Sequence, residues 1–351
     1  MSLALRRNFS IVGENKTVGK ENNKKDLHIK VCLTEGVEAP VSHGLEKIML
    51  KPGFPDFAFS EIDTSSQFLG KKLSVPLIIA PLTGGGKFSR RINNNLARAA
   101  EILKIGMSVG SQKLMLDGKS TPASYLVREM APSVPLLANL GVVHVRRGLD
   151  YLKKAVELIG ADGLSLYINP LQEVLQEKGE CDFTGLWTML EELAENFPYP
   201  LILKEVGFGM APSLLKWAGE KRNISGVDVA GLGGTNWARI EGLLSRCNYS
   251  LYETWGIKTR DAIITGRAYL RKDQFLIASG GIRNGFDMAK AFALGADLVA
   301  MGLPFLRWAS RSQEEIIRGG RTLEQELKVA LWFTGSRTVK EIYGKFYWQE
   351  G

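Results

Sequence analysis

Short apolar runs alternate with amphipathic stretches along most of the chain, beginning near residue 75. The apolar runs occupy residues 75–80, 105–109, 135–140, 163–168, 200–203, 226–229, 275–278 and 298–301. Between them, apolar positions recur at helical spacing over residues 89–103, 121–130, 148–159, 183–196, 211–221, 259–270 and 284–294. Strands that alternate with helices form parallel sheets, and eight such strands close a barrel. The pattern therefore predicts an α/β fold, a (β/α)8 TIM barrel, in preference to an open doubly wound sheet.

The barrel pattern is flanked by segments of a different character. Residues 4–70 are polar and irregular, with short strands expected within 44–54 and 57–69. Residues 71–310 carry the barrel, and residues 231–258 are too long for a tight loop, so we expect an insertion over the carboxyl ends of the strands. Residues 311–346 are predicted to form two helices. We interpret the whole chain, residues 1–351, as one domain with an amino-terminal extension and carboxyl-terminal helices.

Paired glycines mark the last two strand ends of the predicted barrel. Ser279-Gly280-Gly281 follows one apolar run, and Gly302 ends the next. Glycine lets the backbone N–H groups approach a ligand closely, and helix N-termini attract anions. The last two strand–helix turns are the usual phosphate site of this barrel. We therefore expect a ligand that bears a phosphate at these turns.

Composition narrows the function classes. The chain has 351 residues, 45% hydrophobic content and a formal net charge of +8, which suits an anionic substrate or is simply a basic surface. The basic residues are dispersed, so we expect no nucleic-acid partner. No apolar stretch of about 18 residues and no secretory signal is present, so we expect no membrane partner and a cytoplasmic location. Three scattered cysteines indicate a reducing compartment and no zinc site.

Two polar groups follow strand ends where a barrel carries its chemistry. Lys204 ends an apolar run and needs either an anionic ligand or a salt bridge to a carboxylate such as Asp228. In Asn169-x-x-Gln172-Glu173, the carboxylate suits Mg²⁺ that is also bound to substrate phosphates, or it is a solvated loop glutamate. The three histidines, His28, His43 and His144, receive no catalytic role from the pattern alone.

Nine motifs make the chain resemble type 2 isopentenyl diphosphate isomerase, a family of flavin-dependent barrels, from about residue 24 to residue 342. They are KKDLHI (24–29), APLTGG (80–85), GSQK (110–113), NLG (139–141), NPLQE (169–173), KEVGFG (204–209), DVAGLGGTNWARIE (228–241), SGGIRNG (279–285) and TGSRT (334–338). The sixth and eighth motifs are shared with other FMN barrels. NPLQE together with the seventh motif is specific to this family.

The resemblance implies a cofactor site and a substrate site. FMN would be bound by Leu82, Thr83, Gly84, Ser111, Asn139, Lys204, Thr235 and Asn236, with its phosphate at Gly281, Ile282, Arg283, Gly302 and Leu303. A prenyl diphosphate would contact Lys24, Lys25, His28, Ser111, Gln112, Lys113, Asn169 and Gln172, with Mg²⁺ on Glu173. Gln172 would be the catalytic side chain over the allylic carbons.

The resemblance also implies a reaction. Isopentenyl diphosphate would be converted to dimethylallyl diphosphate in isoprenoid biosynthesis. Because the strand ends offer few acids or bases, reduced FMN itself would donate and accept the proton. NAD(P)H would reduce the flavin, and the protein would be a homotetramer or homo-octamer. We also hypothesise that the amino-terminal lysine cluster folds over the ligand only when it is bound.

Four positions depart from the family pattern. Lys24-Lys25 stands for a usual Arg-Lys, Lys113 for an arginine, Tyr167 for a histidine and Asn236 for a serine. Lysine lacks the bidentate fork of arginine, and tyrosine is a neutral donor. Since three of these changes fall on the diphosphate side, a different prenyl phosphate is an alternative substrate.

Three other classes of protein share some of these features. An FMN oxidoreductase of the 2-hydroxy-acid oxidase type shares the GGIR motif and the strand-end lysine, but it needs a histidine base, and no histidine follows His144. An inosinate-dehydrogenase-like enzyme needs a cysteine nucleophile on a strand-end loop, and neither Cys181 nor Cys247 has that context. A non-enzymatic flavin sensor or degenerate barrel stays open because of Tyr167 and the lysine substitutions.

Overall fold

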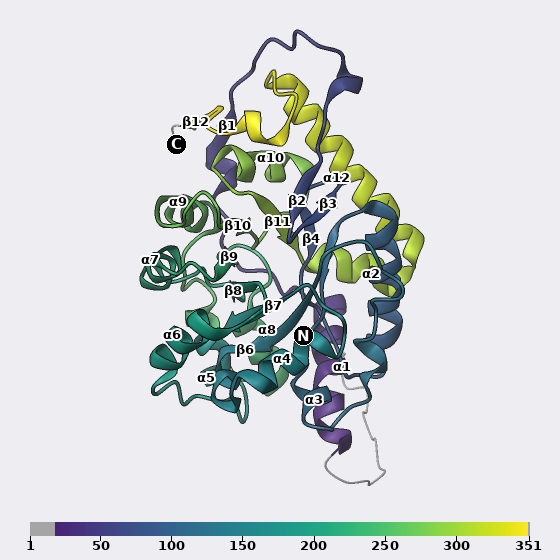
Figure 1. Cartoon of the computed structure of the whole chain (residues 1–351), viewed down its shortest axis with the longest axis vertical. Coiled ribbons are helices and arrows are strands. Elements are labelled where there is room, and N and C mark those ends of the chain that lie inside the picture. The colour runs from purple at the N-terminus through teal and green to yellow at the C-terminus, as the bar shows by residue number, and fades with distance from the viewer. Residues whose placement is uncertain (1–17, 350–351) are drawn as a thin grey trace, which may run out of the picture.

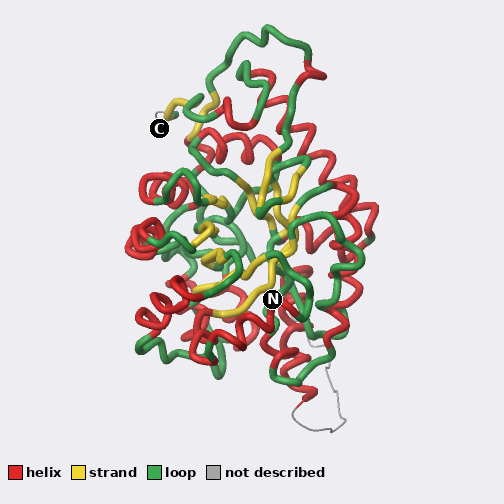
Figure 2. Tube along the Cα trace, in the orientation of Figure 1, coloured by secondary structure: helices red, strands yellow, loops and turns green. Residues whose placement is uncertain are grey.

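Eight parallel strands form a closed barrel, as the alternation of runs predicts (Figures 1 and 2). The computed structural model describes the backbone of residues 18–349 and the side chains of residues 25–349. The strand β11 pairs with β4 and so closes the cylinder. The barrel strands are β4 (Leu77–Ile79), β5 (Gly106–Ser108), β6 (Leu136–Gly141), β7 (Gly163–Ile168), β8 (Leu201–Glu205), β9 (Ile224–Asp228), β10 (Phe275–Ala278) and β11 (Leu298–Met301).

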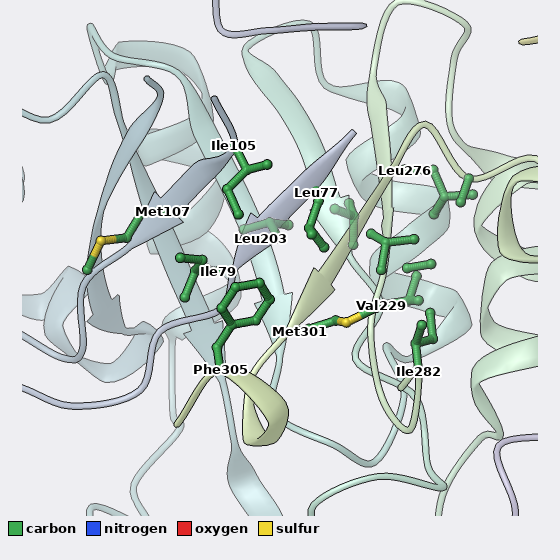
Figure 3. Packing of buried hydrophobic residues seen from close by; sticks show 14 of the residues in the cluster. Leu77, Ile79, Ile105, Met107, Leu203, Val229, Leu276, Ile282, Met301 and Phe305 are labelled. Atoms are coloured by element: carbon green, nitrogen blue, oxygen red, sulfur yellow. The ribbon is translucent and has the colours of Figure 1, made fainter. Parts of the chain in front are cut away.

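Alternate side chains of each strand enter two different cores. Leu77, Ile79 and Leu203 point outward into the layer between strands and helices, which Figure 3 shows from close by. Ile78 and Ile202 point inward and fill the cylinder. Both sets are buried, which explains why the strands appear in the sequence as continuous apolar runs.

A hairpin of the amino-terminal extension closes the end of the cylinder at which the barrel strands begin. The strands β2 (Ser66–Phe68) and β3 (Lys71–Leu73) pair antiparallel, and Phe68 and Leu73 belong to the interior core. The Phe68 ring meets Phe275 edge-on at 5.0 Å between ring centroids. Ligands therefore approach the barrel from the other end, where the strands have their carboxyl termini.

Most helices lie within a few residues of the predicted ranges and surround the strands (Figure 1). The helices between strands are α2 (Ser89–Leu103), α4 (Leu149–Glu157), α6 (Leu186–Asn196), α7 (Pro212–Glu220), α9 (Thr259–Tyr269) and α10 (Gly285–Ala293), and α11 (Leu303–Arg311) follows the last strand. The prediction of a helix over 121–130 is wrong. That segment holds only the 3-10 turn Pro122–Ser124, because the Arg128 guanidinium satisfies the carbonyls of Gly160, Ala131 and Val134 in a loop conformation.

The amino-terminal extension is more regular than predicted. Helix α1 (Val18–Thr34) lies within the segment that we expected to be irregular. It packs against α8 (Trp237–Ser245) and α11, with Ile29 and Cys32 buried. The apolar residues of the helix, most of which lie in residues 27–33, form no single apolar face, so tertiary contacts rather than its own pattern account for its docking.

The carboxyl-terminal segment forms one long helix instead of two. Helix α12 (Gln313–Phe333) packs on α2 and α10. Gly335, with φ of 61°, then turns the chain into the 3-10 helix Val339–Ile342. The last strand, β12 (Phe346–Trp348), pairs antiparallel with β1 (Ile48–Leu50), so the two flanking segments meet at one end of the molecule.

The segment 231–258 lies where the sequence predicted an insertion. It holds α8 and the 3-10 turn Ser250–Tyr252, and α8 packs against α1 and against α5 (Pro170–Leu175), which follows β7. Within residues 18–349, no helix has the length and apolar character needed to span a bilayer.

Candidate active site

Polar side chains replace the apolar interior where the strands end. Tyr167, Lys204 and Asp228 stand next to one another on β7, β8 and β9 by strand register. Lys204 and Asp228, together with the inward-facing Ser108 and Ser165, line a small cavity in the barrel mouth. The side chains at the carboxyl ends of the barrel strands are therefore suited to a polar ligand.

The buried lysine is paired with an acid. Lys204 Nζ lies 2.7 Å from Asp228 Oδ2, and Ser279 Oγ lies 2.5 Å from Asp228 Oδ1. Both charged groups are more than nine-tenths buried. Asp228 is the only acceptor that Lys204 Nζ meets in the described part of the chain, so the ammonium keeps donors for a ligand. The salt-bridge interpretation is confirmed, and it leaves the ligand interpretation possible.

The glycine turns after β10 and β11 present free backbone donors. Ala278 and Val299 are register partners on β10 and β11, so the two turns are neighbours. Among the described residues, no acceptor meets the backbone N–H groups of residues 281–283 or 302–303. Gly281 has φ of 81°, and a Cβ there would lie 2.4 Å from Gly233 O. The cluster of donors fits a phosphate, as the sequence predicted.

Neighbouring protein atoms require a glycine at position 281 but not at position 302. A Cβ at Gly302 would meet only Leu82 Cδ2 at 3.4 Å and Ala80 Cβ at 3.8 Å, which are ordinary contacts. The backbone at this position has φ of −108°. A glycine that neither the fold nor the dihedral angle requires is consistent with close approach of a ligand.

The loop after β4 is held rigidly. Thr83 Oγ1 lies 2.7 Å from Ser89 Oγ, and Asn93 Nδ2 donates to the Thr83 carbonyl at 3.0 Å. A Cβ on Gly84 would lie 2.1 Å from the buried Tyr125 ring. Leu82 is half-buried at the base of this loop. The predicted flavin loop is therefore fixed before any ligand binds, which favours binding.

Two predicted ligand contacts lie among amides at the ends of β5 and β6. Gln112 is fully buried, with its Nε2 donating to Ala155 O at 2.8 Å and its Oε1 accepting from Asn139 N at 3.0 Å. Asn139 Oδ1 is buried without a partner among the described atoms. An orphaned buried amide oxygen fits a hydrogen-bond donor of the flavin ring. Contact of the Gln112 side chain with a substrate stays a prediction, because the fold already uses both ends of its amide.

Asn236 is likewise used by the fold. Its side chain caps α8 by accepting from Arg239 N at 3.0 Å and donates to Glu253 O at 2.8 Å. It has no exposed surface. Thr235 beside it forms an isolated bridge with Glu38 and is half-buried. Thr235 is therefore the more accessible of these two predicted flavin contacts, and both contacts stay predictions.

Helix α1 places cationic residues at the rim of the mouth. Lys25 Nζ donates to Ser111 O at 2.9 Å and lies 3.4 Å from Tyr125 OH. His28 Nε2 lies 3.2 Å from Glu241 Oε1. The side chain of Lys24 lies outside the described residues. The predicted diphosphate contacts Lys25, His28 and Ser111 are therefore brought together, although they come from different parts of the sequence.

Glu241 was not assigned a role from the sequence. Its carboxylate is 2% exposed and accepts from Gln172 Nε2 at 3.3 Å as well as from His28. It therefore orients the side chain that we predicted to be catalytic. Glu241 lies at the end of the long glycine-rich motif of residues 228–241, and that position was the only signal for it in the sequence.

Glu173 is surrounded by donors. Asn169 Nδ2 donates to Glu173 Oε1, while Gln176 Nε2 and Glu180 N donate to Oε2, each at 2.8 Å. Asn169 Oδ1 is buried and has no partner among the described atoms. No group of three acids, histidines or cysteines able to bind a metal occurs among the described residues. One carboxylate and one amide oxygen fit Mg²⁺ only if other ligands come from the substrate and water.

Lys113 and Tyr167 complete the predicted substrate side. Lys113 Nζ forms an ion pair with Glu180. Tyr167 OH donates to Ser111 Oγ at 3.3 Å, and burial raises the pKa of Tyr167 to about 12. The phenol is thus a neutral donor at physiological pH.

Several proteins of known name are similar to this chain over most of its length. The isopentenyl-diphosphate delta-isomerase of Paracoccus zeaxanthinifaciens is 42% identical over 85% of this chain and 88% of its own. That of a Synechococcus strain is 40% identical over 94% of this chain and 95% of its own. This chain belongs to the type 2 isopentenyl-diphosphate delta-isomerase family. A family model described as FMN-dependent dehydrogenase also matches residues 169–349, which agrees with a flavin-binding member of the isomerase family.

Solved structures extend the comparison of the fold only. A crystal structure of mandelate oxidase superimposes on this isomerase-family chain with a TM-score of 0.63 over 95% of this chain and 98% of the oxidase, at 16% identity. At that identity the likeness concerns the barrel and not the reaction. The identification as an isomerase-family member therefore depends on the sequence relatives and on the motifs at the mouth.

Proposed function

We propose that the protein interconverts isopentenyl and dimethylallyl diphosphate with bound FMN. The observation that carries this proposal is the arrangement of the mouth. A cluster of free N–H groups at residues 281–283 and 302–303 lies beyond β10 and β11, and Lys25 and Lys113 lie beyond β5, which β4 separates from β11. Two separate anion sites suit a flavin phosphate and a substrate diphosphate, and the relatives that are 37–42% identical carry this activity in their names.

The residues present fit FMN. Its phosphate would lie at Gly281, Ile282, Arg283, Gly302 and Leu303, and its ring would contact Leu82, Thr83, Gly84, Ser111, Asn139, Lys204, Thr235 and Asn236. Reduced FMN supplies the proton donor and acceptor for an allylic shift. The chain's own groups hold the ring, exclude water and orient the alkene. NAD(P)H is the proposed reductant.

The neighbouring protein groups are poor acids and bases at neutral pH. Burial raises the pKa of Tyr125 above its usual range and that of Tyr167 to about 12, so both phenols keep their protons. Tyr125 OH donates to Ser111 O at 2.9 Å and fixes the loop that carries the diphosphate contacts. Gln172, anchored by Glu241, would direct its amide toward the reacting carbons. These groups would position the substrate without exchanging its protons, and bound FMN would supply the acid–base chemistry.

The proposed metal is Mg²⁺ on Glu173, with the substrate diphosphate as a further ligand. Substituting Glu173→Gln removes the charge but keeps an acceptor for Gln176 Nε2 and Glu180 N. We expect the Mg²⁺ concentration for half-maximal activity to rise about tenfold or more, with the flavin absorbance retained. Titration of activity with Mg²⁺ measures the effect, and loss of flavin from the variant would contradict the metal assignment.

An anaerobic assay tests the reaction. The purified protein, whose flavin spectrum is recorded first, is incubated with isopentenyl diphosphate, Mg²⁺ and NADPH. We expect dimethylallyl diphosphate to form without net consumption of NADPH. Reduction of the flavin by substrate alone would instead indicate an oxidase, and a protein that cannot be reconstituted with FMN would indicate a degenerate barrel.

The assembly and location stay proposals based on the family resemblance. We propose a homotetramer or homo-octamer that works in the cytoplasm. Light scattering of the purified protein measures the assembly.

A further inference from the structure

The loop between α5 and α6, here called the 176–182 loop, contacts both Glu173, the proposed metal ligand, and Lys113, a predicted diphosphate contact. Its start is attached to Glu173, because Gln176 Nε2 and Glu180 N both donate to Glu173 Oε2 at 2.8 Å. Cys181 Sγ also lies 3.4 Å from the Glu173 carbonyl. The loop therefore rests on the residue proposed to hold the metal.

Close packing determines the path of this loop. A Cβ on Gly179 would lie 1.8 Å from Glu173 O, so only glycine permits the loop to approach α5 this closely. The close approach therefore gives the backbone of Glu180 a defined position at the rim of the barrel mouth.

At that place the Glu180 carboxylate meets Lys113. The two side chains form an ion pair, with 44% of the Glu180 side chain and 34% of the Lys113 side chain exposed. The carboxylate therefore already faces the lysine that would bind the substrate's anion.

We propose that Glu180 is a placeholder carboxylate that occupies the diphosphate position on Lys113 and must be displaced when substrate binds. The inference rests on the proposed function for the identity of the diphosphate, although it concerns the anion site itself. Because an anionic carboxylate and a diphosphate repel each other at one lysine, Glu180 lowers the affinity for the substrate. It also selects for ligands with enough charge to replace it.

Displacement of Glu180 also affects the metal site. The backbone N–H of the same residue donates to Glu173, so a shift of the loop backbone at Glu180 would release a donor from the carboxylate that would bind Mg²⁺.

The test compares two charge-removing substitutions in one loop. Glu180→Gln keeps the backbone N–H but removes the charge that faces Lys113. Glu177→Gln removes the same charge from an exposed side chain of the same loop, which has no ion pair among the described residues. The probe is inorganic pyrophosphate titrated into the FMN-loaded protein in the presence of EDTA, with binding followed by calorimetry.

We expect Glu180→Gln to bind pyrophosphate about three- to tenfold more tightly than the wild type, and Glu177→Gln to match the wild type, since exposed ion pairs have modest strength. In a Lys113→Met background the gain from Glu180→Gln should disappear. A gain in affinity is not what a damaged fold produces. Equal or weaker binding by Glu180→Gln would overturn the inference, as would an equal gain from Glu177→Gln.

The outcome is separable from that of the proposed function. If the wild type isomerises isopentenyl diphosphate but Glu180→Gln shows no gain, the placeholder inference alone is wrong. If the wild type lacks that activity and Glu180→Gln still binds pyrophosphate more tightly, the placeholder is supported and the reaction is not.

Discussion

At the scale of single residues, Glu241 connects the groups around the substrate. Its buried carboxylate accepts from Gln172 and His28, which belong to α5 and α1. We predict that Glu241→Ala lowers kcat/KM about ten- to a hundredfold, since hydrogen bonds to a charged group contribute about 1.5–3 kcal/mol. FMN absorbance should be retained, because Glu241 touches none of the predicted flavin contacts.

A matched control for Glu241 is Glu220→Ala, at an exposed position that ends α7. Steady-state kinetics with both variants measure the effect. Wild-type kcat/KM in Glu241→Ala would show that Gln172 needs no anchor.

Glu205 gives a pH prediction. Burial raises its pKa from 4.5 to about 7, although its Oε2 accepts from Val206, Gly207 and Phe208 N–H groups at 2.6 Å. Because the folded-state pKa lies above the unfolded one, the native state is favoured below pH 4.5 and loses this stability as pH rises through 7. The loss is on the order of 3 kcal/mol.

The measurement is urea unfolding at pH 5 and pH 8 for the wild type and for Glu205→Gln, which cannot ionise but keeps an acceptor. We expect the unfolding free energy of the wild type to fall more between the two pH values. Parallel pH profiles for the two proteins would contradict the raised pKa.

At the scale of elements, the turns after β10 and β11 allow a paired test. A Cβ at Gly302 fits beside Leu82 and Ala80, whereas one at Gly281 collides with Gly233 O. We predict that Gly302→Ala folds with an unchanged melting temperature without FMN and binds FMN at least tenfold more weakly. Gly281→Ala should lower the melting temperature itself. Fluorescence titration measures FMN affinity, and thermal unfolding measures the melting temperature. Wild-type FMN affinity in Gly302→Ala would show that the FMN phosphate does not bind at this turn.

The elements also show what the sequence reveals. The barrel was predictable because buried parallel strands are continuously apolar and the surrounding helices are amphipathic. Helix α1 was missed because its apolar residues, most of which lie in residues 27–33, form no single apolar face, and the burial of Ile29 and Cys32 depends on α8 and α11. The prediction of a helix at 121–130 failed because the Arg128 guanidinium bonds to the carbonyl of Gly160, which is 32 residues away along the chain. Long-range contacts of this kind leave no periodic signal.

Some residues of the candidate site could likewise be identified from the sequence, and others could not. Gly281 and Lys204 were identifiable because their residue types are unusual at strand ends. Glu241 was not, because its partners His28 and Gln172 are 213 and 69 residues away along the chain. Asn236 was expected to meet the flavin, yet its amide caps α8, a role that depends on a backbone conformation the motif does not specify.

At the scale of the whole molecule, α1 lies over the barrel mouth and bridges several loops. Lys25 reaches Ser111, and Asp26 Oδ2 accepts from Lys87 N at 3.2 Å. Within residues 25–34 only Ile29 and Cys32 are buried, so we predict that this helix exchanges its amide hydrogens faster than β7 in the free protein. FMN and isopentenyl diphosphate together should slow exchange in residues 25–34 and leave β7 unchanged.

Hydrogen exchange followed by mass spectrometry measures this, with FMN alone as the control. Equal protection of α1 with and without substrate would contradict the hypothesis that this segment closes on the ligand.

The pairing of β1 with β12 has a consequence for biosynthesis. Residues 48–50 meet residues 346–348, so the whole stretch between them must leave the ribosome before β1 finds its partner. At 5–20 residues per second, translation of the intervening length takes roughly 15 to 60 s. During that interval the edge of strand β1 is open to chaperones, and the codons for residues 346–348 complete the pairing.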